Sequence, residues 1–136
     1  MFHFILPLFF IFQKKKKKQT NKQTLLFCNL CSVAEMSKRA DDRSNALYSF
    51  IDNSGGFYSA PVAKDARSRM NVVFRIKDKD AALEKKFVAE AEARKLHTLK
   101  GHRSVGGLRA SLYNAMPMDG VLALLAFMKE FQEANQ

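Results

Sequence analysis

Cysteine is scarce in this 136-residue chain, and both cysteines lie in one short segment, Cys28-Asn-Leu-Cys31. The CxxC spacing occurs in zinc sites and in thioredoxin-type redox sites. No second CxxC and no HxxxH pair accompanies it, and His97 and His102 lie far along the chain. Two cysteines cannot supply the four ligands of a structural zinc site. We therefore predict no metal site and interpret Cys28 and Cys31 as unpaired thiols in a reducing compartment.

The chain also lacks a hydrophobic run of membrane-spanning length. The longest, Phe2 to Phe12, has eleven residues, whereas a helix needs about 20 to cross a bilayer. A signal peptide carries its basic region before the apolar one, but here a lysine block, Lys14 to Lys18, follows it. The sequence therefore predicts neither a membrane segment nor a signal peptide.

Residues 1–35 differ in composition from the rest of the chain. They hold the low-complexity sequence, both cysteines and none of the six glycines. The lysine block and its Gln, Thr and Asn neighbours are typical of a disordered segment, with a nuclear-localisation or membrane-surface role as the alternative. Translated T-rich and A-rich non-coding DNA has the same composition. We interpret 1–35 as a disordered tail or a gene-prediction error, with native sequence resuming near Ser32 to Met36.

The net charge of +10 is divided equally between residues 1–35 and residues 36–136. The second part has the length of one domain, and its moderate positive charge suits acidic small molecules as well as nucleic acid. It shows no aromatic residues beside basic ones on a strand and no motif of a nucleic-acid reader. We therefore predict one domain, 36–136, that binds no nucleic acid.

Hydrophobic periodicity predicts alternating helices and strands in this domain. Ser37 is the expected N-cap of the first helix, Asp78 to Asp80 precede the second, and Pro117 and Asp119 introduce the last. We expect helices over 37–52, 80–96 and 119–136, and extended segments over 57–62, 72–76, 97–100 and 108–113. The order α-β-β-α-β-β-α predicts an α+β fold, a two-layer sandwich with helices packed on a mostly antiparallel sheet.

The segment 101–109, Gly-His-Arg-Ser-Val-Gly-Gly-Leu-Arg, gathers three glycines, a histidine and two arginines. Arginine offers a fork of donors that fits carboxylate and phosphate oxygens, and glycines let the backbone bend sharply and approach a ligand. The pattern indicates an anion site, and a solvated basic turn is the alternative. It is not a Walker A loop, because Gly107 and Leu108 stand where the lysine and the hydroxyl residue belong.

The expected strand after this bend separates its side chains between two faces. Leu108, with its alternating neighbours, should face the core, so that Arg109 faces outward. A turn through the glycines would fold His102 and Arg103 back toward Arg109. Such a cluster suits a ligand with two separated acidic groups, Arg109 binding one and His102 with Arg103 the other.

Residues 36–136 closely resemble the C-terminal, small domain of the phosphoserine aminotransferase family, a class V group of pyridoxal-phosphate enzymes. The run KGHRSVGGLRASLYNA at 100–115 carries the resemblance most strongly. Further matches in the same order are IDNSGGFY at 51–58, MNVVFRI at 70–76, ALEKKF at 82–87 and AFMKEF at 126–131. The residues before Ser32 match nothing in that family.

This resemblance implies a cytoplasmic, homodimeric transferase of serine biosynthesis. It would exchange an amino group between glutamate and 3-phosphohydroxypyruvate, giving phosphoserine and 2-oxoglutarate. By the family's pattern, Arg109 binds the substrate carboxylate, and His102 with Arg103 binds the substrate phosphate. The anion site inferred from the residues agrees with a substrate that has two acidic ends.

The resemblance also implies that essential parts are missing from this chain. The family's cofactor lysine, the aspartate at the pyridine nitrogen and the stacking aromatic residue belong to a large domain upstream. The cofactor supplies the electron sink of transamination, so we predict no catalytic residue and no bound pyridoxal 5'-phosphate here, and a fragment that is inactive alone. The alternative is a non-catalytic anion-binding or dimer-partner module. Loss of the large domain should also expose apolar surface.

Overall fold

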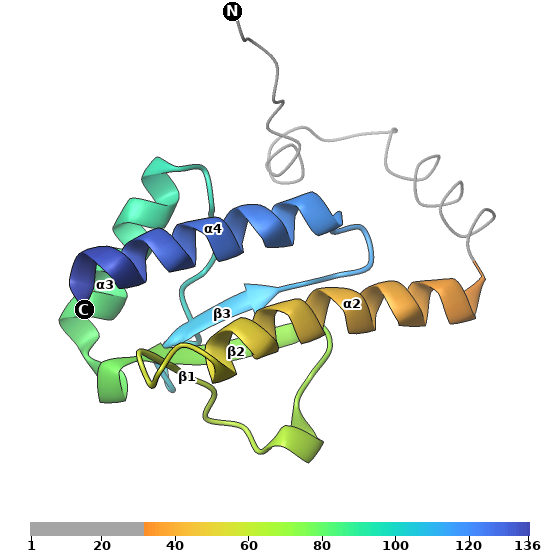
Figure 1. Ribbon diagram of the computed structural model, residues 1–136, viewed down its shortest axis with the longest axis horizontal. Coiled ribbons are helices and arrows are strands. Elements are labelled where there is room, and N and C mark those ends of the chain that lie inside the picture. Colours follow the sequence, from red (N-terminus) through yellow and green to blue (C-terminus); the bar gives the residue numbers. More distant parts are fainter. Residues whose placement is uncertain (1–31) are drawn as a thin grey trace, which may run out of the picture.

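Helices pack against one face of a small antiparallel sheet in the computed structural model, which describes residues 32–136 (Figure 1). The predictions for residues 1–31, including the disordered tail and the Cys28/Cys31 pair, lie outside this range. The elements are α2 (Val33–Asp52), β1 (Tyr58–Ser59), β2 (Asn71–Ile76), α3 (Ala81–Ala93), β3 (Leu108–Ser111) and α4 (Met118–Asn135), with short 3-10 turns η1 (Lys64–Ala66) and η2 (Lys77–Lys79). The predicted α+β class is confirmed.

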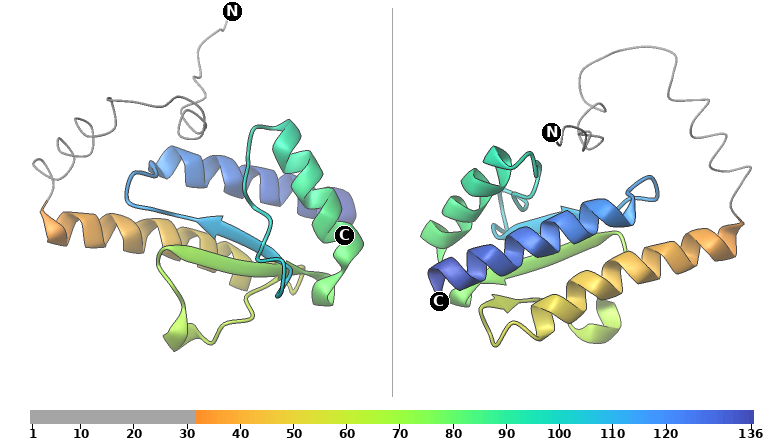
Figure 2. Two further views of the ribbon diagram at one scale, coloured as in Figure 1. Left: turned by 180° about the vertical axis from the view of Figure 1, so that it is seen from behind. Right: turned by 45° about the horizontal axis from the view of Figure 1, so that its top comes forward.

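The sheet has the strand order β1-β2-β3, and both pairings are antiparallel. Val72, Phe74 and Ile76 of the central strand are fully buried, and the residues between them are half-buried. This is the alternation expected of a strand with one covered face. Viewed from behind, the strands lie in front of α2 and α4, so these helices share the covered side (Figure 2).

Helix α2 begins earlier than the sequence analysis predicted. The side chain of Ser32 caps the helix by accepting a 3.2 Å hydrogen bond from the backbone N–H of Glu35, so the prediction of Ser37 as N-cap is wrong. The pattern Ser-x-x-Glu at 32–35 is that of a capping box. It was missed because Val33, 88% exposed, adds nothing to the apolar periodicity. The helix thus includes the last three residues of the predicted tail.

Three predicted extended segments are shorter than expected, and the last of them, predicted over 108–113, ends at Ser111. The first, predicted over 57–62, extends only over Tyr58–Ser59, and Pro61 follows with no N–H to donate to a ladder. The extended segment predicted over 97–100 contributes a single bridge, Lys100 to Leu108. Positive φ angles at Lys95 and Thr98, 65° and 61°, turn this segment away from regular strand geometry.

Aromatic rings form the centre of the core between the sheet and the helices. Phe87 of α3 is fully buried, and its ring centroid lies 4.8 Å from that of Phe127, 5.0 Å from Phe131 and 5.9 Å from Phe74. Most of these contacts are edge-to-face or tilted, as aromatic pairs prefer. Phe87 therefore joins α3 to both α4 and β2.

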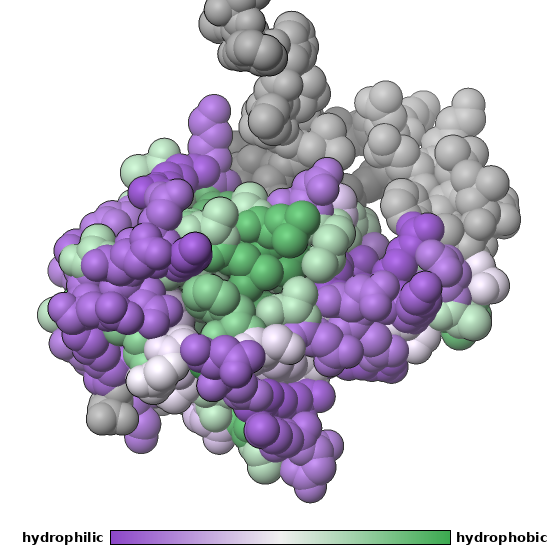
Figure 3. Space-filling model, in the orientation of Figure 1, coloured by the Kyte–Doolittle hydropathy of each residue, from purple (hydrophilic) through white to green (hydrophobic). Residues whose placement is uncertain are grey.

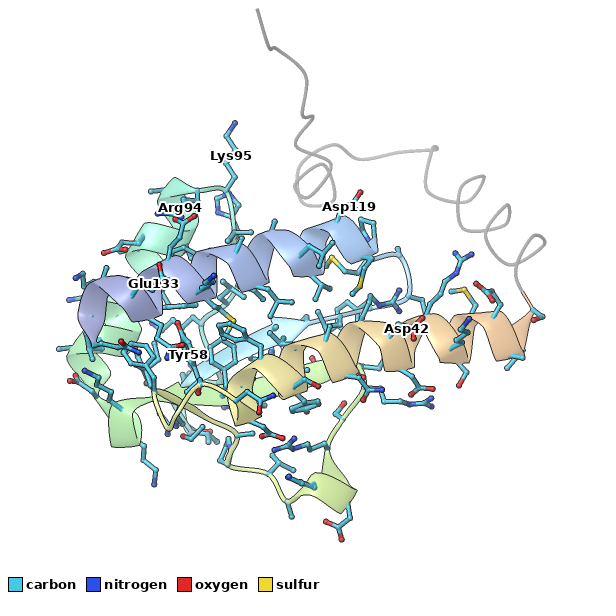
Figure 4. All side chains as sticks on the ribbon, viewed as in Figure 1. Asp42, Tyr58, Arg94, Lys95, Asp119 and Glu133 are labelled. Atoms are coloured by element: carbon cyan, nitrogen blue, oxygen red, sulfur yellow. The ribbon has the colours of Figure 1, made fainter. Side chains whose placement is uncertain are left out.

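Tyr58 carries the one polar group of this aromatic cluster. It lies on the side of the sheet that faces α4 (Figure 4), and its hydroxyl donates a 2.8 Å hydrogen bond to the carbonyl oxygen of Met128. Burial raises the pKa of the Tyr58 hydroxyl well above its ordinary range. The neutral phenol is therefore the form that the fold stabilises.

We expect Tyr58 to make the fold sensitive to alkali. Above the ordinary tyrosine pKa of about 10, the unfolded chain loses this proton while the folded chain keeps it, so the free energy of unfolding falls as pH rises. Tyr58→Phe should remove this part of the fall and cost about 1 kcal/mol at neutral pH. Urea unfolding at a series of pH values, from neutral to strongly alkaline, measures the loss at neutral pH and the fall of the free energy of unfolding with rising pH. Tyr113→Phe, at a side chain that is 57% exposed, is the control and should change neither.

One side of α4 leaves apolar side chains exposed. Leu122 is 51% exposed and Met118 is 38% exposed, and Figure 3 shows a hydrophobic area over α4 bordered by polar residues. That a large domain would cover this area stays a prediction. Among residues 32–136, no helix is long and apolar enough to cross a membrane.

Candidate anion-binding site

The glycine-rich segment forms the end of a narrow hairpin that leads into β3. The backbone N–H of Arg109 donates to the carbonyl of Leu99, and the N–H of Gly101 donates to the carbonyl of Gly107, both at 2.8 Å. Between these two bonds lies the Lys100–Leu108 bridge. In Figure 2 the chain between α3 and β3 passes along the sheet and turns back into β3. Residues 102–106, which we name the hairpin tip, are thereby projected from the sheet.

The hairpin tip is closed by a tight turn. The carbonyl of His102 accepts hydrogen bonds from the N–H groups of Val105, at 3.0 Å, and Gly106, at 2.7 Å. Gly106 and Gly107 have φ angles of 71° and 76°, which glycine adopts without strain. A Cβ at Gly101 would lie 2.7 Å from the carbonyl oxygen of Gly107. The glycines predicted to bend the chain therefore do so.

The His102 ring is oriented by the residue two positions on. Its Nδ1 accepts a 3.3 Å hydrogen bond from the backbone N–H of Ser104 and lies 2.6 Å from the Ser104 hydroxyl oxygen. When Nδ1 accepts, the neutral ring carries its proton on Nε2. His102 and Arg103 are both exposed, so the imidazole Nε2–H and the guanidinium can donate to a ligand at the tip.

Arg109 lies at the base of the hairpin, in β3 opposite Val73 of β2. Leu108 and Ala110 are buried on the core side, and Arg109 is half-buried on the other. The predicted division of faces is confirmed. The Nε atom of Arg109 is buried and has no hydrogen-bond partner among residues 32–136. A buried donor without a partner is an exception among folded proteins.

The three predicted site residues belong to one hairpin but are not joined by any contact. His102 and Arg103 are neighbours at the tip, and Arg109 follows three residues after it on β3. In the part of the chain that the structure describes, no hydrogen bond links their side chains, and neither guanidinium has an acidic partner. The convergence of the three groups on one ligand stays a prediction.

Arg75 is a site-adjacent residue that the sequence analysis did not select. Its Nη2 donates a 2.7 Å hydrogen bond to the carbonyl of Val105 in the hairpin tip, and its Nη1 lies 3.1 Å from the carboxylate of Glu84. The sequence does contain one signal for Arg75. It lies between the core residues Phe74 and Ile76 of β2, so its side chain must face the side of the sheet opposite the core. Its partners lie 9 and 30 positions away, which local pattern cannot reveal.

The described residues do not fit a pyridoxal-phosphate centre. Such a centre requires a lysine held in an enclosed site, and every lysine in residues 32–136 is exposed. Lys95, for example, projects away from the body of the molecule (Figure 4). The same residues contain no group of three or more His, Cys, Asp or Glu side chains that could hold a metal ion. The hairpin carries histidine and arginine side chains, and their role in anion binding stays a prediction.

Curated proteins similar to this chain are phosphoserine aminotransferases. The chain is 55% identical over 103 residues to the enzyme of Stenotrophomonas maltophilia and 51% identical over 115 residues to that of Pasteurella multocida. A probable phosphoserine aminotransferase of Dictyostelium discoideum is 48% identical over 108 residues. These matches cover 76%, 82% and 79% of the chain, respectively, but 28%, 31% and 29% of the relatives. No protein-family model matches the sequence.

Solved structures give the same result. The pyridoxal-phosphate-bound phosphoserine aminotransferase of Trichomonas vaginalis superposes with a TM-score of 0.73 at 39% identity, covering 80% of this chain and 31% of that one. The enzyme of Bacillus circulans subsp. alkalophilus gives 0.70 at 44% identity, covering 73% of this chain and 27% of that one. The chain thus spans under a third of the length of the proteins that it resembles.

Proposed function

We propose that this chain is the substrate-binding part of a phosphoserine aminotransferase. The chain is similar to a segment that makes up under a third of the length of those enzymes. His102 and Arg103 would bind the phosphate of 3-phosphohydroxypyruvate or phosphoserine, and Arg109 would bind the carboxylate. The observation that carries this proposal is the hairpin itself. It carries two arginines and one histidine, and none of the salt bridges found among residues 32–136 involves Arg103 or Arg109.

The complete enzyme of this proposal exchanges an amino group between glutamate and 3-phosphohydroxypyruvate. Pyridoxal phosphate would supply the electron sink for that exchange, and its lysine would lie in the portion of the relatives that this chain does not span. Formation of a homodimer, a cytoplasmic location and a role in serine biosynthesis belong to the same proposal. The chain alone should show no transaminase activity, because every lysine that the structure describes is exposed.

Titration of the full 136-residue chain with O-phospho-L-serine and with L-serine tests the proposal. Backbone amide signals of 102–103 and 109 should shift with phosphoserine, and serine should bind at least about tenfold more weakly because it lacks the charged group that the tip recognises. Arg69→Gln removes an exposed arginine that pairs with Asp41 at 3.1 Å, and this control should bind phosphoserine as the unaltered chain does. Equal affinity for the two ligands would contradict the proposal.

The alternative is a non-catalytic module that binds anions or pairs with a full-length subunit. The exposed lysines favour it over an independent enzyme. A coupled transaminase assay separates the two functions. Turnover by this chain alone would exclude the module, and turnover that appears only when the missing part is supplied would support the substrate-binding role.

A further inference from the structure

We propose that Arg75 is a positioning residue, which holds the hairpin tip in the conformation that binds phosphate. This inference rests on the proposed function of His102 and Arg103. Arg75 itself does not bind the ligand in this proposal. It acts on the backbone that carries the two binding residues.

The Arg75 guanidinium ties the hairpin tip to two secondary-structure elements. Arg75 comes from β2, its Nη2 donates 2.7 Å to the Val105 carbonyl, and its Nη1 lies 3.1 Å and 3.3 Å from the two carboxylate oxygens of Glu84 in α3. The fork of arginine allows both partners to be bound at once, which the single ammonium of lysine does less well. The tip is therefore fixed against β2 and α3 through one side chain.

Two glycines of the hairpin leave the space that Arg75 occupies. A Cβ at Gly107 would lie 2.8 Å from Cδ and 2.9 Å from Nε of Arg75, and a Cβ at Gly106 would lie 3.2 Å from Nη1. Arg75 thus lies directly against the bare backbone of both residues. Any side chain at position 107 would displace it from the Val105 carbonyl.

Glu84 determines what Arg75 contributes to the charge of the site. The side chains of the Arg75–Glu84 pair are 16% and 11% exposed, so each charge depends on the other for compensation. Because Glu84 neutralises Arg75, the positive charge offered to a ligand comes from His102 and Arg103. Loss of Arg75 alone would loosen the tip and also leave a carboxylate uncompensated near the phosphate.

The test uses the full 136-residue chain, inorganic phosphate as the probe and three variants. Arg75→Lys retains the charge but not the fork, and the double variant Arg75→Met with Glu84→Gln removes the fork without leaving a buried charge unpaired. Arg67→Lys is the matched control, because Arg67 forms a comparable pair with Asp52, at 2.7 Å and 2.8 Å, remote from the hairpin. The order of the amides of 102–106 is measured by 15N heteronuclear NOE without ligand, and phosphate affinity by titration.

Both Arg75 variants should lower the NOE values of 102–106 and weaken phosphate binding at least about fivefold, roughly the effect of one lost hydrogen bond. The double variant should unfold at nearly the temperature of the unaltered chain, which separates tip order from global stability. Arg67→Lys should change neither tip order nor affinity.

A tip that stays ordered in Arg75→Lys, or one that loosens without loss of phosphate affinity, would overturn the assignment of Arg75. Absence of phosphate binding by the unaltered chain is a different result. It would overturn the proposed function of His102 and Arg103, and with it the binding role of Arg75, whatever the NOE values show.

Discussion

Phe87→Ala is expected to destabilise the fold by about 3 to 5 kcal/mol, the usual cost of removing a buried phenylalanine. Phe87 is fully buried and contacts rings from α4 and β2. Its removal leaves a cavity where three elements meet, and the surrounding rings cannot close it without losing their edge-to-face contacts. A loss of this size is a large part of the stability of an ordinary small domain.

Urea unfolding followed by far-UV circular dichroism measures the effect of Phe87→Ala. Phe50→Ala is the matched control, because Phe50 lies at the margin of the core, where it is half-buried, and its removal should cost clearly less. Equal losses at the two positions would show that the centre of the core does not lie at Phe87.

Arg109→Lys should weaken the binding of phosphoserine about 10- to 100-fold, in proportion to the 1.5 to 3 kcal/mol of a hydrogen bond to a charged group. Lysine keeps the charge but cannot present two parallel N–H groups to a carboxylate. The long side chain leaves the β2–β3 pairing, which is made by backbone atoms, intact. The expected loss is therefore one of recognition and not of folding.

Ligand choice separates the roles of the two arginines in titrations of the full chain. Arg109→Lys should leave the affinity for inorganic phosphate unchanged, because this ion has no carboxylate. Arg103→Lys should weaken phosphate and phosphoserine binding together. If Arg109→Lys lowers the affinity for phosphate as much as for phosphoserine, the carboxylate assignment of Arg109 is wrong.

The bend of 101–107 and the two faces of the strand after it could be predicted because the relevant signals are local. The glycines of 101–107 and the alternation of Leu108, Arg109 and Ala110 each depend on neighbours within a few positions, and the structure shows both the turn and the two faces. The resemblance added what local pattern cannot supply, the chemical identity of the ligand. The curated relatives are named phosphoserine aminotransferases, which supports the resemblance, and the ligand of this chain stays a proposal.

The errors arose where distant contacts or weak periodicity decide the structure. Apolar periodicity does not reveal the N-cap at Ser32, because the first turns of α2 bury little apolar surface. Arg75 was not selected because its two partners come from α3 and from the hairpin tip. The strand predicted over 57–62 pairs with β2 at only two residues, Tyr58 and Ser59. It ends there because Pro61 follows and has no N–H to donate to the ladder.

The pairing of Leu99 to Gly101 alongside β3 has a consequence for how copies of this chain can meet. An exposed sheet edge can recruit a strand from another molecule. On the side of β3 that faces away from β2, Leu108 and Arg109 are already paired with residues 99–101. The strand at the opposite margin, β1, is only two residues long. Addition of a strand from a second copy is therefore disfavoured at both margins of the sheet that the structure describes.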